Sequence, residues 1–304
     1  MTSAVSPAPL AALPVNQQMT GPVLAMLAKL QKPLTRTQNI LDFGCGTGRH
    51  VYEFRDSGYR AFGVDLNDYL ALREPEDRQW FKTSNDPDVY RIPFPDEHFD
   101  VIYSTQVFEH LRYYEPALKE MRRVLRPGGV CIHVFPSKWR PLETHFRIPL
   151  GGVFKTSSWL NLWTHLGCKA ADAPPNIGPR LHARRYWEEC RTNLNYLSQR
   201  ELRFYAGMFF GKVEFMEREF VEATASTSGF SRLLKPLIPL PTVEFFYRHF
   251  HTKVMVLSGY SSYAPVWPIG WKPGCPSICN RKTAAGWVGR HSPQIDCEAC
   301  ARNA

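Results

Sequence analysis

The sequence predicts an α/β fold with a doubly wound, mostly parallel sheet, and two stretches in its first quarter carry this prediction. The apolar run 39–43 is typical of a buried parallel strand, and it is followed by glycines at positions 44, 46 and 48. Glycines let a backbone turn tightly and approach a ligand closely. A second apolar run, 61–64, leads into Asp65. An acid about twenty residues after a glycine-rich turn is typical of a carboxylate that binds ribose hydroxyls, so the two stretches indicate a nucleotide-type cofactor site.

The residues of the glycine turn narrow the choice of cofactor. The turn reads Gly-Cys-Gly-Thr-Gly over 44–48, with Asp42 two residues before it. Dinucleotide-binding folds favour G-x-G-x-x-G facing a pyrophosphate, whereas a carboxylate at Asp42 suits a cationic group. The pattern D-x-G-C-G-T-G resembles motif I of the class I S-adenosylmethionine (SAM) dependent methyltransferases. This resemblance implies a seven-stranded, Rossmann-like sheet and SAM as the cofactor.

The elements around the turn follow in order. Residues 1–20 are rich in Ala, Pro, Ser and Gln, which predicts a disordered lead, and 21–30 have the apolar spacing of a helix. A crossover helix is expected over 51–56 and a second strand over 61–65. The region 70–88 is polar and predicts no clear element.

Two later phrases match the same family. The stretch 92–103 resembles the phrase that leads into the family's fourth strand, and Arg-Pro-Gly-Gly at 126–129 resembles the turn before the fifth, expected at 130–135. A helix over 117–125 is expected between them. These matches predict a SAM-binding core over 21–136.

Beyond this core the prediction rests on patterning alone. Ser198, with Glu201 three residues later, predicts a capped helix over 198–210. Alternation of apolar residues predicts a strand over 213–220, and 253–257 is expected to be the last strand.

The remaining segments are interpreted as additions to the sheet. Residues 137–197 are predicted to form a substrate lid, 198–260 complete the core with a second insertion near 223–251, and 261–304 form a cysteine-bearing tail. Basic and aromatic residues mix within 230–250. Two interpretations stay open there, contact with a bilayer or lipid-like acceptor and, as the favoured one, a buried core helix.

The resemblance assigns the SAM contacts to residues near strand ends. Asp42 and the glycines are expected to hold the methionine part, Asp65 the ribose, and Asp88 the adenine, with Asp86 as the alternative. The predicted cofactor-binding residues are Asp42, Gly44, Cys45, Gly46, Gly48, Asp65, Leu66, Asp88 and Gln106.

Methyl transfer requires an aligned acceptor and, for a hydroxyl or amine, a base. The candidate catalytic residues are His110, His145 and Glu143, since a carboxylate two residues from an imidazole can tune it as a base. A loop ion pair of Glu143 with Arg140 is the alternative. His133 is expected to face the core.

Two sets of residues are candidate metal ligands. Glu109 and His110 resemble part of the E-x-x-E-H motif of ubiquinone-pathway and small-RNA O-methyltransferases, but Gln106 replaces the first acid, so a positioning role at a helix start is favoured. The tail carries C-x3-C and C-x2-C spacing, which predicts a structural zinc site, with free thiols or a disulfide as alternatives. Its ligands would be Cys275, Cys279, Cys297 and Cys300.

Composition and charge bound the partners. The 304 residues are 44% hydrophobic and 21% charged, which indicates neither disorder nor a membrane-spanning class. With no apolar run of about eighteen residues and no signal-peptide pattern, a cytoplasmic location is expected. The net charge of +9 permits a nucleic acid or an anionic membrane surface as partner, but the basic residues are scattered, so a nucleic acid is not favoured. No pattern indicates the oligomeric state.

The sequence therefore predicts an enzyme that transfers a methyl group from SAM to a small-molecule or lipid-like acceptor, on oxygen rather than nitrogen or carbon. One alternative is a methyltransferase-like binding module that has lost catalysis and recruits a partner. A second alternative is an RNA methyltransferase. A nicotinamide-dependent oxidoreductase is disfavoured by Asp42 and by the spelling of the glycine turn.

Overall fold

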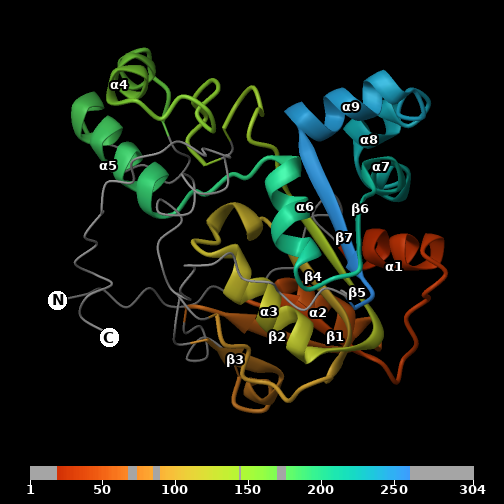
Figure 1. Ribbon diagram of the computed structural model, residues 1–304. Coiled ribbons are helices and arrows are strands. Elements are labelled where there is room, and N and C mark those ends of the chain that lie inside the picture. The colour runs from red at the N-terminus through yellow and green to blue at the C-terminus, as the bar shows by residue number, and fades with distance from the viewer. Residues whose placement is uncertain (1–18, 68–73, 85–89, 144, 170–175, 261–304) are drawn as a thin grey trace, which may run out of the picture. The chain divides into compact units, whose positions relative to one another are not determined.

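A seven-stranded sheet with strand order β3-β2-β1-β4-β5-β7-β6 forms the centre of the computed structural model (Figure 1). The model describes residues 19–67, 74–84, 90–143, 145–169 and 176–260. The chain divides into two units after residue 262; the described residues all belong to the first, and the second, 263–304, lies outside them. The strands are β1 Asn39–Phe43, β2 Arg60–Asp65, β3 Phe81–Thr83, β4 Phe99–Thr105, β5 Leu125–Pro136, β6 Lys212–Phe215 and β7 Thr252–Ser258.

The pairing of the strands confirms the predicted fold class. The pairs β1–β2, β2–β3, β1–β4 and β4–β5 are parallel, and β7 runs antiparallel to both β5 and β6. The helices and 3-10 turns (η) are α1 Thr20–Lys29, α2 Arg49–Asp56, η3 Arg78–Trp80, η4 Phe108–His110, α3 Tyr114–Val124, α4 Ser157–His165, α5 Pro179–Thr192, α6 Gln199–Gly207, α7 Glu217–Thr224, α8 Gly229–Leu234 and α9 Pro241–Phe250. No helix among the described residues is long and apolar enough to span a bilayer.

The two faces of the sheet bury separate apolar clusters, because side chains alternate along a strand. In β1, Leu41 belongs to the cluster that contains residues of α3 and α6, and Ile40 belongs to the cluster that contains residues of α1 and α2. Both side chains are fully buried. Helices on both faces therefore hold the carboxyl ends of β1, β2 and β4 in place.

Two predicted elements differ from the structure. The strand expected over 213–220 ends at Phe215, and α7 begins at Glu217. Glu217 is fully buried and accepts hydrogen bonds from Arg248 and from the Val254 amide, which fixes the start of the helix. The region 70–88 contains the three-residue strand β3, which is too short to give an alternating pattern. By contrast, the capping box of Ser198 and Glu201 is present at the start of α6.

The interpretation of 230–250 as a buried core helix is wrong for one side of α9. Tyr247 is buried, but Phe245 and Phe246 expose 52% and 59% of their surface. Apolar periodicity predicted the helix correctly, but it does not say how much of the helix the rest of the protein covers.

Candidate functional site

A cleft of about 230 Å³ opens at the carboxyl ends of β1, β2 and β4. Ligands of open α/β sheets bind at this edge, where the strand order reverses. The cleft combines the glycine turn, the end of β2 and the segment after β4. Its lining residues are Phe43, Gly44, Val64, Asp65, Leu66, Asn67, Ser84, Tyr90, Gln106, Val107, His110 and Leu111.

The glycine turn has a backbone that only glycine adopts without strain. Gly44 and Gly46 have φ angles of 77° and 51°. A Cβ on Gly44 would lie 2.4 Å from the Val107 side chain. The Gly46 amide donates a hydrogen bond of 2.8 Å to one carboxylate oxygen of Asp65, and the Asn67 amide donates one of 2.9 Å to the other. The carboxylate is thus held at the cleft by the glycine turn and by its own loop.

The predicted cofactor residues take different positions relative to this cleft. Gly44, Asp65, Leu66 and Gln106 line it. Cys45, Gly46 and Gly48 belong to the glycine turn but are not lining residues, and Asp88, like Asp86, lies outside the described residues.

Asp42 lies behind the cleft. It is 3% exposed, and it contributes, after burial, to raising the pKa of the buried Tyr103 hydroxyl. Asp42 is therefore close to the glycine turn in sequence but is not a lining residue of the cleft. The sequence motifs did not predict Asn67, Ser84 and Tyr90, which also line the cleft. Asn67 could have been predicted from its position two residues after Asp65.

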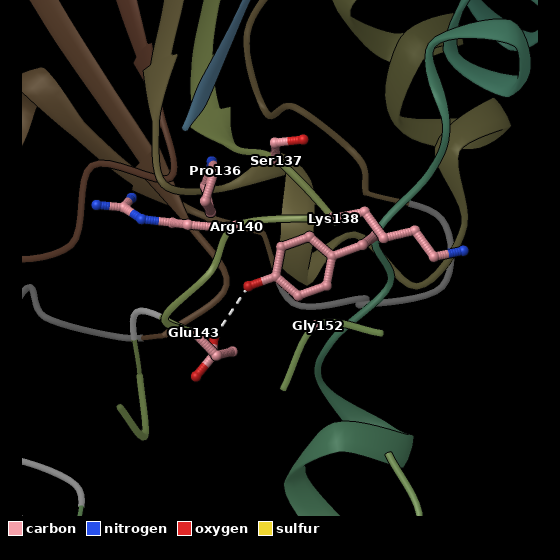
Figure 2. Close-up of a pocket in the computed structure, with 7 residues that line it drawn as sticks. Pro136, Ser137, Lys138, Arg140, Glu143 and Gly152 are labelled. Atoms are coloured by element: carbon pink, nitrogen blue, oxygen red, sulfur yellow. Dashed lines mark hydrogen bonds between the residues drawn. The ribbon is translucent and has the colours of Figure 1, made fainter. Parts of the chain in front are cut away.

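The three predicted catalytic residues lie together in one chain of hydrogen bonds, and His110 is the member that lines the cleft. His110, on η4, is 3.1 Å from His145, measured between the two Nε2 atoms. His145 Nδ1 is 2.6 Å from a carboxylate oxygen of Glu143. Tyr196 donates a hydrogen bond of 3.0 Å to the same carboxylate. Arg140 points away from Glu143 (Figure 2). The ion-pair partner of Glu143 is therefore His145.

The hydrogen bonds fix where the protons of this pair are. The Asn193 carbonyl, 2.9 Å from His110 Nδ1, can only accept, and the Glu143 carboxylate accepts from His145 Nδ1. Both Nδ1 atoms are therefore donors, so in a neutral pair the two Nε2 lone pairs face each other and repel. One cation between the two nitrogens removes that repulsion.

When that cation is a proton, the shifts in pKa indicate that His145 rather than His110 carries it. Burial lowers the pKa of His145, but the hydrogen bond and charge of Glu143 outweigh burial and raise it overall. Burial lowers the pKa of His110 despite its bond to Asn193. The same contacts with His145 lower the pKa of Glu143 against the effect of burial, so Glu143 stays ionised beside the pair.

Glu109 is a buried carboxylate at the same place. It is fully buried, and neither of its carboxylate oxygens accepts a hydrogen bond from another residue. Burial raises its pKa to about 7. One donor atom each from Glu109, His110 and His145 lies within 4.8 Å of the others, so these three residues could also hold a metal ion.

Replacing Glu109 by glutamine is expected to stabilise the fold above pH 7. A carboxyl with a pKa of about 7 when folded and an ordinary value of 4.5 when unfolded destabilises the protein progressively from pH 4.5 to pH 7 and fully above it. The shift corresponds to about 3 kcal/mol. Urea unfolding should show Glu109→Gln gaining about that much over wild type at pH 8 and little at pH 5. A gain that does not change with pH would contradict the assignment, and exposed Glu188→Gln serves as the control.

The predicted zinc ligands Cys275, Cys279, Cys297 and Cys300 lie outside the described residues. None of the described cysteines forms a disulfide, and Cys45, Cys131 and Cys190 are buried. His133 is fully buried, as expected, and lies 2.8 Å from the Ser104 hydroxyl.

Comparison with known proteins agrees with this geometry. Residues 41–133 match the family model of a methyltransferase domain. The chain is 34% identical over 131 residues to the ubiquinone/menaquinone biosynthesis C-methyltransferase UbiE of Cupriavidus metallidurans, covering 40% of this chain and 52% of that one. It is 32% identical over 150 residues to an uncharacterized methyltransferase of Schizosaccharomyces pombe, covering 41% and 54%. The chain thus spans about half the length of the curated relatives it matches.

Among solved structures, phosphoethanolamine N-methyltransferase 2 of Haemonchus contortus in complex with SAM matches with a TM-score of 0.42 at 13% identity. The match covers 78% of this chain and 52% of that one.

Proposed function

We propose, from the premise that residues 41–133 form a class I SAM-dependent methyltransferase domain, that this chain transfers a methyl group from SAM to a small or lipid-like acceptor. The observation that carries the proposal is that two features of the site lie at the same cleft. One is the glycine turn with Asp65, and the other is the hydrogen-bonded pair His110–His145, whose first member lines the cleft.

The residues of the cleft fit SAM. A Cβ at position 44 would fill the cradle, as its contact with Val107 indicates, and the Asp65 carboxylate suits ribose hydroxyls. The buried Asp42 contributes negative charge near the turn, which favours a cationic ligand. Bound SAM supplies a methyl group that its sulfonium makes electrophilic.

The base in this proposal is the histidine pair. Its neutral form has two facing lone pairs, so uptake of the acceptor's hydroxyl proton relieves their repulsion, and ionised Glu143 stabilises the resulting imidazolium. The new bond joins the methyl carbon to the acceptor oxygen as the carbon–sulfur bond breaks. Activity should therefore increase as pH rises through the pKa of the pair.

The nature of the acceptor is inferred from the cleft and the relatives. Leu66, Val107 and Leu111 give the cleft an apolar side, which suits a lipid-like molecule. The UbiE relatives are named for ubiquinone and menaquinone synthesis, and they are C-methyltransferases. We propose O-methylation here because a base of this kind acts on a hydroxyl proton.

Two measurements test the proposal in sequence. Calorimetric titration of the full chain with SAM should show binding at one site. Incubation with methyl-labelled SAM and a panel of phenols, prenylated hydroquinones and amines should then place the label on oxygen. Label on a ring carbon would replace O-methylation by C-methylation. SAM binding without transfer to any panel member or to a cell lipid extract would favour the binding-module alternative, and failure to bind SAM would refute the proposal.

Two further assignments stay predictions from the sequence. They are a structural zinc ion on the tail cysteines and a cytoplasmic location. Metal analysis of the purified chain tests the first, and replacement of the four tail cysteines by serine should remove the metal.

A further inference from the structure

An exposed apolar surface covers α8, α9 and the loop between them. These elements and α7 lie side by side next to β7 (Figure 1). Every large apolar residue of this outer apolar surface exposes between 38% and 75% of its area. Its members are Phe230, Leu233, Leu237, Leu240, Phe245, Phe246 and Phe250.

The fold does not need this surface for its own packing. A separate cluster of Val221, Ile238 and Tyr247, all buried, joins α7, α9 and the connecting loop. In α9, Val243 and Tyr247 point to that cluster at helical spacing, whereas Phe246 and Phe250, also four residues apart, face outward. One side of α9 therefore packs in the protein interior, and the other side leaves its apolar side chains exposed to solvent.

The outward rings contact one another rather than scatter. Phe246 lies 5.8 Å from Phe245 and 5.7 Å from Phe250, measured between ring centroids. Phe230, on α8, stacks on His251 at 4.9 Å. Exposed aromatic rings that contact one another are typical of an interaction site.

The charges beside the surface indicate which partner it fits. The stretch 229–243 contains Arg232 and Lys235, both exposed, and no acidic residue. The acid that follows, Glu244, is paired with Arg248. Within the described part of the chain, Arg232 and Lys235 form no ion pair with a carboxylate. An apolar surface flanked by such cations is complementary to an anionic lipid bilayer, whose headgroups attract cations and whose acyl boundary takes up apolar side chains.

We propose that the outer apolar surface docks the protein on an anionic lipid bilayer, with its Phe and Leu side chains at the acyl boundary and Arg232 and Lys235 on the lipid phosphates. This docking is a binding property of α8 and α9. It stands independently of methyl transfer, and its test contains no turnover measurement.

Flotation of the full chain with lipid vesicles tests the proposal. Wild type should bind vesicles that contain about a third phosphatidylglycerol and bind phosphatidylcholine vesicles weakly. The double variant Phe245→Ser/Phe246→Ser should lose about tenfold or more in binding. Arg232→Glu/Lys235→Glu should abolish the preference for anionic vesicles. Phe204→Ser on α6, which is 58% exposed in wild type, should bind like wild type.

Three outcomes would overturn the proposal. The first is absence of the wild type from the floated fraction at low salt. The second is flotation of the double Phe variant at the wild-type level, with thermal melting showing that both proteins are folded. A wild-type dimer in light scattering that the double Phe variant dissociates, without vesicle binding, would assign the surface to a second copy of the chain.

Discussion

Replacing His145 by alanine is expected to lower the rate constant of methyl transfer by about 1000-fold, the usual effect of removing a positioned base. His145 bonds to both His110 and Glu143, so its loss removes the member of the pair that holds the proton and leaves a buried carboxylate without its cation. The dissociation constant of SAM should stay within about twofold, because His145 is not among the lining residues of the cleft.

The measurement is single-turnover transfer of labelled methyl, with calorimetry for SAM on the same samples. His165→Ala is the matched control, since His165 is an exposed histidine on α4 whose ring bonds to the Asn161 carbonyl of the same helix. If His145→Ala transfers methyl at the wild-type rate, the histidine pair is not the base. A chelator that abolishes wild-type transfer would instead assign Glu109, His110 and His145 to a metal ion.

Replacing Asp65 by alanine is expected to weaken SAM binding by about 100-fold. The variant would lack the charge-assisted hydrogen bonds between the carboxylate and the ribose, which contribute about 1.5–3 kcal/mol. The Gly46 amide in the glycine turn would also lose its hydrogen-bond acceptor. Calorimetry with SAM measures the effect. Asp96→Ala is the control, because Asp96 is an exposed acid outside the cleft. Unchanged affinity in Asp65→Ala would move the cofactor away from this cleft.

The core around β1 and β2 could be predicted because its signals are local. Gly46 and Asp65 are only 19 residues apart, and the turn between a buried strand and a helix allows few backbone paths. The glycine pattern and the acid therefore predicted a parallel α/β sheet with a ligand site at the turn and at Asp65, and both residues Gly44 and Asp65 line the cleft.

The contacts of the histidine pair could not be predicted in the same way. His110 and His145 are 35 residues apart, and no spacing rule sets the 3.1 Å between them. Their meeting depends on the path of the chain back to η4, where the Asn195 amide donates to the Glu109 carbonyl and Tyr114 donates to the Asn195 carbonyl. The sequence therefore predicted which residues are candidates for the base, but only the tertiary structure shows that the two histidines are in contact.

The outward side of α9 shows a different limit. Phe245, Phe246 and Phe250 have the composition of a core helix, and propensity and periodicity treat buried and exposed apolar faces alike. Only the arrangement of α7 and β7 decides which side is covered.

The position of β7 has a consequence for biosynthesis. This strand lies between β5 and β6, and Ser137, just after β5, is 116 residues away from its bonding partner Lys253 on β7. At about 5–20 residues per second, the ribosome needs roughly 6–20 s to make the missing neighbour. During that interval the backbone N–H and C=O groups on this edge of β5 are open to pairing with other chains. Chains that end before Thr252 should therefore aggregate. Chaperones that bind nascent chains would be needed longest between the synthesis of β5 and that of β7.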